Sequence, residues 1–438
     1  MASATVQHST TKPLKITLIV CPPEGEVVDP VSPKVYKPAA VKYMPLGLLS
    51  VAANIPAPHT VSVIDASSLG LSVDEVLERI EQSQPDVLGL SVVTYRAWAM
   101  REILRKSSAP IKVVGGPHAT YHHAMIRQQG AHAVFVGDAE KTFPQWLADG
   151  CPPGLFRSKP VDLNTIPFPA RHLMNLDDYR IQPEPGTKLL FNAGGLRLPM
   201  FSSKGCALKC IYCDVQQKEY NAKEPQVIYN EFTVLKDLGA TSIHVLDDTF
   251  NMKKNRVMEM CDLLIKNQFP LSWSVRGIVE VREEIIKTLK EAGCTRFHAG
   301  IEHLDDHVLK IFRKSQRYKD VAKFCALCNK YDIDIVAYFV LGAPDETDEY
   351  RERLPDMIRE LGIRMPFFNI LTPLSETEYY FDLLKKGMFK TNFWQEFVRD
   401  PVRDFVIPQH RTQAEELALT KTLAHYLDVF GPSKSVTS

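Results

Sequence analysis

The chain has 438 residues, of which 45% are hydrophobic and 24% are charged, and its 52 Lys and Arg balance its 52 Asp and Glu. This composition is that of a globular protein with about two or three domains, and the charge balance argues against a nucleic-acid partner. Apolar runs such as residues 16–21 are far shorter than the roughly 20 residues that span a bilayer. Residues 1–13 lack the apolar core of a signal peptide, so we expect a disordered N-terminus and a cytoplasmic protein without membrane contact.

Residues 14–150 alternate short β-branched apolar runs with amphipathic stretches, which predicts an open α/β sheet. The regular spacing indicates the flavodoxin-like (Rossmann-type) strand order 2-1-3-4-5. Residues 151–195 hold many prolines and show no period, so we expect a linker there. The expected strands of the first domain are residues 15–20, 60–65, 86–93, 111–116 and 133–137.

Residues 196–395 return to strand–helix alternation. Six βα units in this range fit a partial (β/α)6 TIM-type barrel better than a second flat sheet. Residues 396–438 are expected to form a C-terminal helical segment, with a helix at 414–430. The expected barrel strands are residues 199–203, 242–247, 271–276, 295–300, 334–340 and 366–371, and the helices lie near 225–238, 254–267, 282–292, 305–330 and 347–361.

Three of the nine cysteines, Cys206, Cys210 and Cys213, stand together in "GCALKCIYCD", directly after the first expected barrel strand. Barrel active sites lie at the C-terminal ends of the strands, so this loop is well placed for chemistry. A structural zinc would need a fourth Cys or His, and the residues that follow offer neither. A 4Fe–4S cluster held by three cysteines leaves one iron open to another ligand. The other six cysteines, including the Cys-x2-Cys at 325–328, are expected to be small buried core residues.

This Cys-x3-Cys-x2-Cys loop, with the aromatic Tyr212 before its last cysteine, resembles that of the radical S-adenosylmethionine (SAM) superfamily. In that family the open iron binds the amino and carboxylate groups of SAM, and an electron from the cluster cleaves SAM to a 5′-deoxyadenosyl radical. The resemblance implies that polar residues at the following strand ends contact SAM.

Asp247 and Asp248 follow the second strand and suit the SAM ammonium, although a helix N-cap would also use Asp. Arg276 ends the third strand, where it would hold a carboxylate or form a surface salt bridge. Glu302, like the family's "GIES" element, is expected near the ribose, although His303 replaces the usual Ser. Gly342 matches the family's glycine-rich turn on the adenine side, whereas residues 373–377 lack the glycine of the usual last turn.

The first domain has no Gly-x-Gly-x-x-Gly fingerprint for a dinucleotide. Its segments at 43–55, 113–120 and 134–143 resemble the cobalamin-binding domain that is fused to many radical SAM enzymes. An Asp-x-His-x-x-Gly motif is absent, so bound cobalamin is expected to be base-off, with its lower face open or water-ligated. The alternative is a lid that binds no corrin. The candidate cobalamin contacts are Thr94, Gly115, Gly116, Pro117, Gly137 and Glu140.

The resemblance is to class B radical SAM methyltransferases. It implies an enzyme that uses a 4Fe–4S cluster, SAM and cobalamin to methylate an unactivated carbon of a small molecule. An external electron donor of the flavodoxin or ferredoxin type is implied as well. The alternatives are a radical cyclase or rearrangement enzyme acting on a tetrapyrrole or natural product without methyl transfer, and a non-catalytic corrin-binding protein. Aromatic residues within 376–438 are expected to close the barrel mouth and favour an apolar or aromatic substrate.

Overall fold

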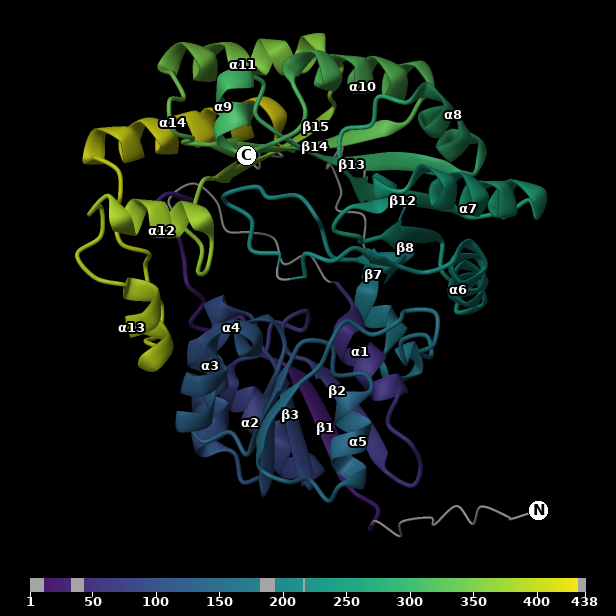
Figure 1. Ribbon diagram of the computed structural model, residues 1–438, viewed down its shortest axis with the longest axis vertical. Coiled ribbons are helices and arrows are strands. Elements are labelled where there is room, and N and C mark those ends of the chain that lie inside the picture. Colours follow the sequence, from purple (N-terminus) through teal and green to yellow (C-terminus); the bar gives the residue numbers. More distant parts are fainter. Residues whose placement is uncertain (1–11, 33–42, 182–193, 216, 432–438) are drawn as a thin grey trace, which may run out of the picture.

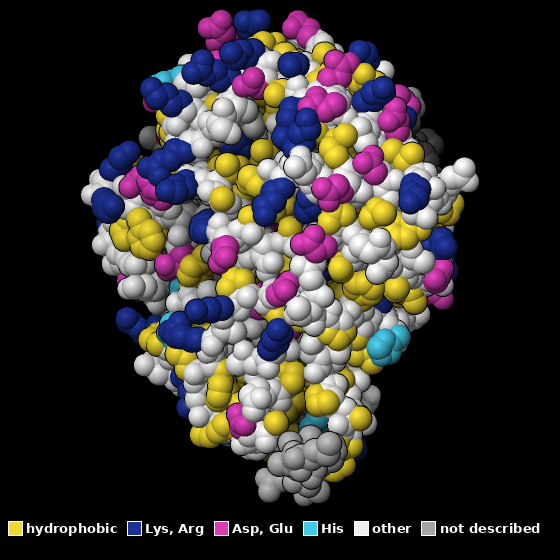
Figure 2. Space-filling view, turned by 45° about the vertical axis from the view of Figure 1, so that its right-hand side comes forward, with side chains coloured by type: hydrophobic (Ala, Val, Ile, Leu, Met, Phe, Trp, Pro, Cys, Tyr) yellow, Lys and Arg dark blue, Asp and Glu magenta, His cyan; other side chains and the backbone are white. Residues whose placement is uncertain are grey.

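The computed structural model describes residues 12–32, 43–181, 194–215 and 217–431. The expected disordered N-terminus therefore lies largely outside the described residues. None of the helices within these ranges is long and apolar enough to cross a membrane. On the face shown in Figure 2, basic and acidic side chains are interspersed rather than gathered into one basic stripe.

The first domain is a parallel sheet in the order β2-β1-β3-β4-β5-β6, which confirms the flavodoxin-like order and adds one strand. The added strand, β6, forms within the stretch expected to be a linker, where it pairs in parallel with β5. The strands are β1 (Lys15–Val20), β2 (Thr60–Asp65), β3 (Val87–Ser91), β4 (Ile111–Gly115), β5 (Ala133–Val136) and β6 (Gly154–Arg157).

Two apolar clusters lie on the two faces of this sheet, and Figure 1 shows the helices on either side of it. Helices α2 (Val73–Ser83), α3 (Ala97–Lys106) and α4 (Pro117–Gln128) pack on one face. Helices α1 (Leu46–Ala53) and α5 (Thr142–Ala148) pack on the other. Buried β-branched runs with helices on both sides are what a parallel sheet requires, because neither of its faces meets water.

The second domain contains six neighbouring parallel strands in one curled sheet, which confirms the partial barrel. A short strand β7 (Arg180–Ile181) joins its open edge antiparallel. Strands β9 (Ser203–Lys204) and β10 (Asn221–Ala222) form a separate two-stranded sheet. The parallel strands are β8 (Gly195–Met200), β11 (Ser242–Val245), β12 (Ser272–Gly277), β13 (Cys294–Glu302), β14 (Asp334–Leu341) and β15 (Met365–Ile370).

The barrel helices are α6 (Pro225–Asp237), α7 (Lys254–Lys266), α8 (Glu283–Glu291), α9 (Asp306–Ile311), α10 (Tyr318–Lys330) and α11 (Asp348–Glu360). The single helix expected at 305–330 is wrong, because α9 and α10 are separate. Arg313 adopts a left-handed φ of 58° between them, and Gln316 donates hydrogen bonds to the Gly300 and Ile301 carbonyls. This break brings residues 313–316 back to the end of β13.

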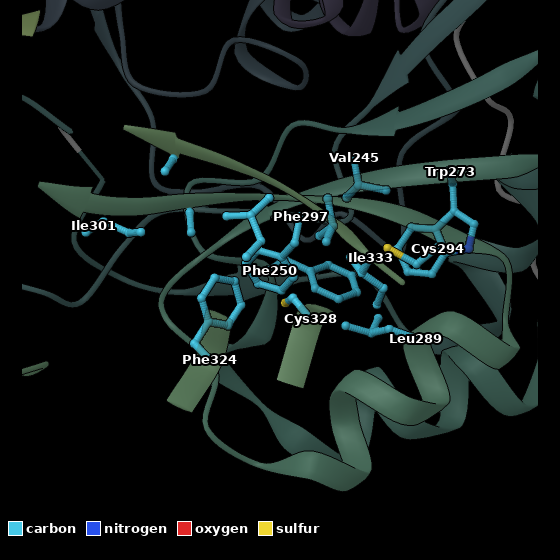
Figure 3. Close-up of a cluster of buried hydrophobic side chains, with 14 of the residues drawn as sticks. Val245, Phe250, Trp273, Leu289, Cys294, Phe297, Ile301, Phe324, Cys328 and Ile333 are labelled. Atoms are coloured by element: carbon cyan, nitrogen blue, oxygen red, sulfur yellow. The ribbon is translucent and has the colours of Figure 1, made fainter. Parts of the chain in front are cut away.

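The apolar core of the barrel lies between its strands and its outer helices (Figure 3). Trp273, Phe297 and Phe324 are fully buried there, and Phe297 meets Phe324 edge-to-face at 5.2 Å. Cys328 lies in the same cluster, so the Cys-x2-Cys is core and not a ligand pair. All six cysteines outside the triplet are buried, as expected.

The C-terminal segment joins the two domains along one side (Figure 1). It contains α12 (Glu378–Lys385), α13 (Phe393–Arg399) and α14 (Gln413–Phe430). Trp394 of α13 meets Tyr95 of the first domain at 6.3 Å, while Tyr426 of α14 packs on Phe368 of β15 at 4.6 Å. The segment therefore fixes one domain against the other.

A buried ion triad fastens the stretch after β6 to the barrel. Arg171 donates to Glu231 of α6 at 2.7 Å and to the Pro199 carbonyl at 2.9 Å, and Lys223 also pairs with Glu231. The Glu231 side chain is fully buried. Burial raises the pKa of Glu231, but Lys223 and Arg171 outweigh it and hold the pKa below the ordinary carboxyl value.

We expect Glu231→Ala to lower the free energy of unfolding by about 3–5 kcal/mol, because two buried cations lose their counter-charge. The stabilisation is present above the ordinary carboxyl pKa and is lost as pH falls through the lowered native pKa. In the variant, the free energy of unfolding should therefore also fall less steeply as the pH decreases into the acid range. Urea unfolding across pH measures both effects, with Glu352→Ala on the exposed face of α11 as the control. Equal stability of the two variants would contradict the triad's role.

Candidate active site

The cysteine loop leaves the barrel at the C-terminal ends of its strands. Cys206, Cys210 and Cys213 are partly exposed, and none is in a disulfide. The Cys206 N–H donates to the Gln217 carbonyl at 3.0 Å, and the Thr249 hydroxyl donates to the Cys206 sulfur at 3.1 Å. The first contact joins the two ends of the loop, and the second places the Cys206 sulfur beside the residues that follow β11.

Gly205 makes this geometry possible. Its φ of 85° is left-handed, and a Cβ there would lie 2.2 Å from the Glu219 carbonyl oxygen. Its N–H donates to Asp248 at 2.9 Å. A glycine is therefore required immediately before the first cysteine.

The donor set fits an iron–sulfur cluster. Among the described residues, no three of the His, Cys, Asp and Glu side chains are arranged around a single metal ion. A cubane cluster does not need such an arrangement, because each cysteine binds a different iron. Burial raises the pKa of the Cys210 thiol, while the charge of Lys314 lowers it. Thiolates are the ligands that such clusters require, and a nearby cation favours the thiolate.

Asp247 and Asp248 have different environments. Asp247 is fully buried and accepts hydrogen bonds from the N–H and hydroxyl groups of Ser202 and Ser203 at 2.5 to 3.0 Å. Its oxygens are thus engaged in fixing the end of β8. Asp248 is more exposed and accepts from the Gly205 N–H. Burial raises the pKa of Asp248.

Glu302 and Lys314 form a pair beside the cysteines. The Lys314 ammonium lies 3.4 Å from the Glu302 carboxylate, and its charge reaches Cys210. Glu302 has a left-handed φ of 67°, and a Cβ on Gly300 would meet its carboxylate at 2.5 Å. Sequence reasoning missed Lys314 because the expected long helix placed it away from the strand end.

Tyr212 and Gly342 are packed by protein. The Tyr212 ring meets Phe312 edge-on at 4.9 Å, and burial raises the pKa of its hydroxyl far above the ordinary value. A Cβ on Gly342 would lie 3.0 Å from Arg411, so this glycine accommodates the segment before α14. Contact of these residues with SAM stays a prediction.

His303, at the position where Ser is usual, is buried. It stacks on Tyr350 at 3.8 Å and lies 3.5 Å from Glu346. These contacts account for His303 as a packing residue behind the strand end.

A cavity of about 400 Å³ lies at the carboxyl edge of the first sheet. Most of its wall comes from the first domain, with Leu18, Val113 and Phe135 on the apolar side, and the cysteine loop adds Lys204 and Gln217. None of the described residues lining it is a histidine. The candidate cobalamin residues that line it are Gly115, Gly116, Pro117, Gly137 and Glu140.

Thr94 does not line the cavity. Its hydroxyl lies 3.3 Å from Nδ1 of the fully buried His118. Burial lowers the pKa of His118 to about 3, so this histidine is a neutral packing residue. Gly116 and Gly137 have left-handed φ values, and a Cβ on either would meet the backbone of Val92 or Ser158 within 3.0 Å.

Lys204 connects the cavity with the cysteine loop. Its ammonium lies 3.0 Å from Glu140 and 3.5 Å from Asp138 of the first domain. Glu140 also accepts from the Ser50 hydroxyl of α1 at 3.0 Å. Because Lys204 directly precedes Gly205 and Cys206, the ion pair joins the cavity wall to the cysteines.

Two family models match the chain. The model of the B12 binding domain matches residues 35–147, and that of the radical SAM superfamily matches residues 200–358. The chain belongs to the radical SAM enzymes that carry a cobalamin-binding domain. Such an enzyme uses a 4Fe–4S cluster, SAM and cobalamin, and the thiols and the cavity described above fit the cluster and the corrin.

Relatives of this radical SAM enzyme are named for different activities. It is 24% identical to an uncharacterized methyltransferase of Pyrococcus horikoshii, over 89% of this chain and 88% of the relative. It is also 24% identical to the anaerobic magnesium-protoporphyrin IX monomethyl ester cyclase of Rubrivivax gelatinosus, over 73% of this chain and 62% of the relative.

A solved structure shares the fold of this radical SAM enzyme. The radical SAM methyltransferase TsrM of Kitasatospora setae, with tryptophan substrate and a SAM analog bound, matches with a TM-score of 0.65. The identity is 18%, and the match covers 85% of this chain and 76% of TsrM.

We expect Gly205→Ala to lose the cluster, because the new methyl group cannot fit against the Glu219 carbonyl. Gly239→Ala is the matched control, since Gly239 has the same left-handed φ, 86°, with nothing within 4 Å of its Cβ position. Both variants carry about 1–2 kcal/mol of backbone strain, so only the contact differs. Iron and sulfide content after anaerobic reconstitution should fall in Gly205→Ala alone. Full iron content in that variant would contradict the assignment.

Proposed function

We propose that this enzyme methylates an unactivated carbon of a small-molecule substrate. The observation that carries the proposal is the shared cavity, to which the first domain and the cysteine loop both contribute. Lys204 and Gln217 reach it from the loop that contains the three cysteines. A corrin held there is adjacent to the cluster loop, which favours transfer between the two cofactors and one substrate.

Different side chains around the loop bind different parts of the cofactors. We assign cluster ligation to Cys206, Cys210 and Cys213. Asp248 offers a carboxylate to the SAM ammonium, because Asp247 is already saturated with hydrogen bonds. Lys314 offers a cation to the SAM carboxylate.

We assign to Glu302 the contact with the SAM ribose. When bound, the cofactors supply one-electron chemistry and a transferable methyl group. An external electron donor of the flavodoxin or ferredoxin type would supply the electrons.

The cavity supports cobalamin binding without a histidine ligand from the protein. His118 is buried behind Thr94 and cannot reach a corrin in the cavity. The apolar wall of Leu18, Val113 and Phe135 suits the apolar parts of the cofactor, and the glycines leave room along the strand ends. These features favour base-off cobalamin.

Anaerobic reconstitution with iron, sulfide and hydroxocobalamin tests the function. After gel filtration the protein should retain corrin, seen in its visible spectrum. With SAM, a reductant and candidate substrates, it should form 5′-deoxyadenosine, S-adenosylhomocysteine and a methylated product. Absence of bound corrin would overturn the proposal. Substrate-dependent 5′-deoxyadenosine without S-adenosylhomocysteine would favour the rearrangement chemistry that the cyclase relative represents.

We expect Gly115→Leu to abolish cobalamin binding and leave the cluster intact. Gly115 lines the cavity, and its Cβ position touches only Phe135, at 3.8 Å or more, so a leucine side chain would occupy the cavity without backbone strain. Gly115→Ala adds one methyl group at ordinary contact distance and is the control. Corrin and iron per protein, measured together after reconstitution, separate the two sites. Corrin retained by Gly115→Leu would show that cobalamin lies elsewhere.

A further inference from the structure

The interior of the barrel is polar, in contrast to the apolar core behind its strands. Side chains alternate along each strand, and the outward set packs under the helices. The intervening positions therefore face the barrel interior. The ionisable and hydroxyl side chains of this inward set include Arg197, Ser242, His244, Ser272, Ser274, Arg276, Arg296, His298, Asp334 and Tyr338.

Two neutral histidines form the middle of this interior. His244 and His298 contact each other edge-to-face, with ring centres 4.6 Å apart. Nδ1 of His244 lies 2.6 Å from the Ser274 hydroxyl, and Nδ1 of His298 lies 3.1 Å from the Tyr338 hydroxyl. Burial lowers the pKa of His298 to about 3 and that of His244 well below the ordinary value, so both are uncharged.

One ring nitrogen of His244 is available to a ligand. The side chain is almost fully buried, and its Nε2 has no hydrogen-bond partner among the described residues. When the Ser274 hydroxyl donates to Nδ1, Nε2 carries the proton and becomes a donor. A buried donor without a partner is costly, so a ligand atom that accepts from it would be favoured.

Arg276 places a positive charge beside these histidines. Arg276 lies opposite His298 in the register of β12 and β13, two residues beyond Ser274, whose hydroxyl contacts His244. Within the described ranges no carboxylate lies within ion-pair distance of Arg276, and its buried Nε lacks a hydrogen-bond partner.

Arg276 is therefore an inward-facing cation to which the described residues offer no counter-charge, whereas Arg296 pairs with Asp334 at 3.6 Å. A partly buried cation without a counter-ion is unfavourable, which indicates that an anion belongs beside Arg276 in the working enzyme.

We infer that the barrel interior binds an anionic group of the substrate, a carboxylate or a phosphate, between the Arg276 guanidinium and the His244 imidazole. Arg276 is then a substrate-binding residue instead of the SAM ligand expected from the sequence. Lys314, beside Cys210, is the cation left for the SAM carboxylate. The inference rests on the proposed function, because it places a substrate at the mouth of the same barrel.

The test measures anion and SAM binding separately on the anaerobically reconstituted holoenzyme. The probes are 4-iodobenzoate, its neutral counterpart 4-iodobenzamide, and inorganic phosphate, with SAM titrated in parallel by calorimetry. The benzoate or the phosphate should bind and the amide should not. If the benzoate binds more tightly than phosphate, the substrate anion is a carboxylate, and if phosphate binds more tightly, it is a phosphate. Loss of a charged hydrogen bond corresponds to roughly 10- to 100-fold in affinity.

Arg276→Gln should weaken anion binding by about tenfold or more and leave SAM affinity unchanged. Lys314→Gln should do the opposite. His244→Phe, which keeps an aromatic ring, should weaken anion binding more modestly. Circular dichroism and iron content verify that each variant is folded and loaded.

Weakened SAM binding in Arg276→Gln with unchanged anion binding would overturn the inference and restore Arg276 as the SAM ligand. Equal binding of the amide and the benzoate would overturn it as well. Failure of the proposed function is a different result, because wild-type protein would then retain no corrin or form no 5′-deoxyadenosine while the anion measurements still stand.

Discussion

The ion pair between Lys204 and Glu140 is the interaction on which the active site depends. Each of the two parallel sheets can present a ligand-binding edge where its strands end. Separately, those edges would be two unrelated sites. Lys204 joins them, because its ammonium is held by Asp138 and Glu140 of the first sheet while its backbone leads directly into the cysteine loop. Burial lowers the pKa of Lys204, but the two carboxylates outweigh it and keep the lysine charged.

Several other contacts, far from the cofactor sites, also hold the first domain against the barrel. The Arg171–Glu231–Lys223 triad fastens the stretch between the domains to the barrel. On the opposite side, α13 packs against the first domain through Trp394 and Tyr95. The two halves are thus connected at more than one place, so the cavity and the cysteine loop keep a fixed relation. Cofactors that must act on one substrate need such fixed geometry.

The sequence predicted the features that depend on local pattern. Strand positions followed from buried β-branched runs, and the cysteine triplet followed from spacing within one loop. The strand β6 was missed because the residues Gly154–Arg157 are few and sit among prolines, so only pairing with β5 reveals them. The break between α9 and α10 was missed for a related reason, since it is fixed by tertiary hydrogen bonds from Gln316 to β13.

The roles of the polar residues could not be predicted from the local sequence pattern. Asp247 and Asp248 are adjacent in sequence and equally suited to a ligand, yet one is saturated by Ser202 and Ser203 and the other is not. Lys204 and Lys314 carry no motif that separates them from surface lysines. Their roles arise from which carboxylate or thiol the fold places opposite them, and this is a property of long-range packing.

The barrel interior shows the same principle in its energetics. A protein selected only for stability would fill this space with apolar side chains, as it does on the other side of the same strands. Instead, arginines, neutral histidines and a tyrosine occupy it, and each is costly to bury without a partner. The histidines satisfy one nitrogen each through Ser274 and Tyr338. The unsatisfied remainder, an imidazole nitrogen and a guanidinium, is directed at the interior, as expected where binding a substrate outweighs stability.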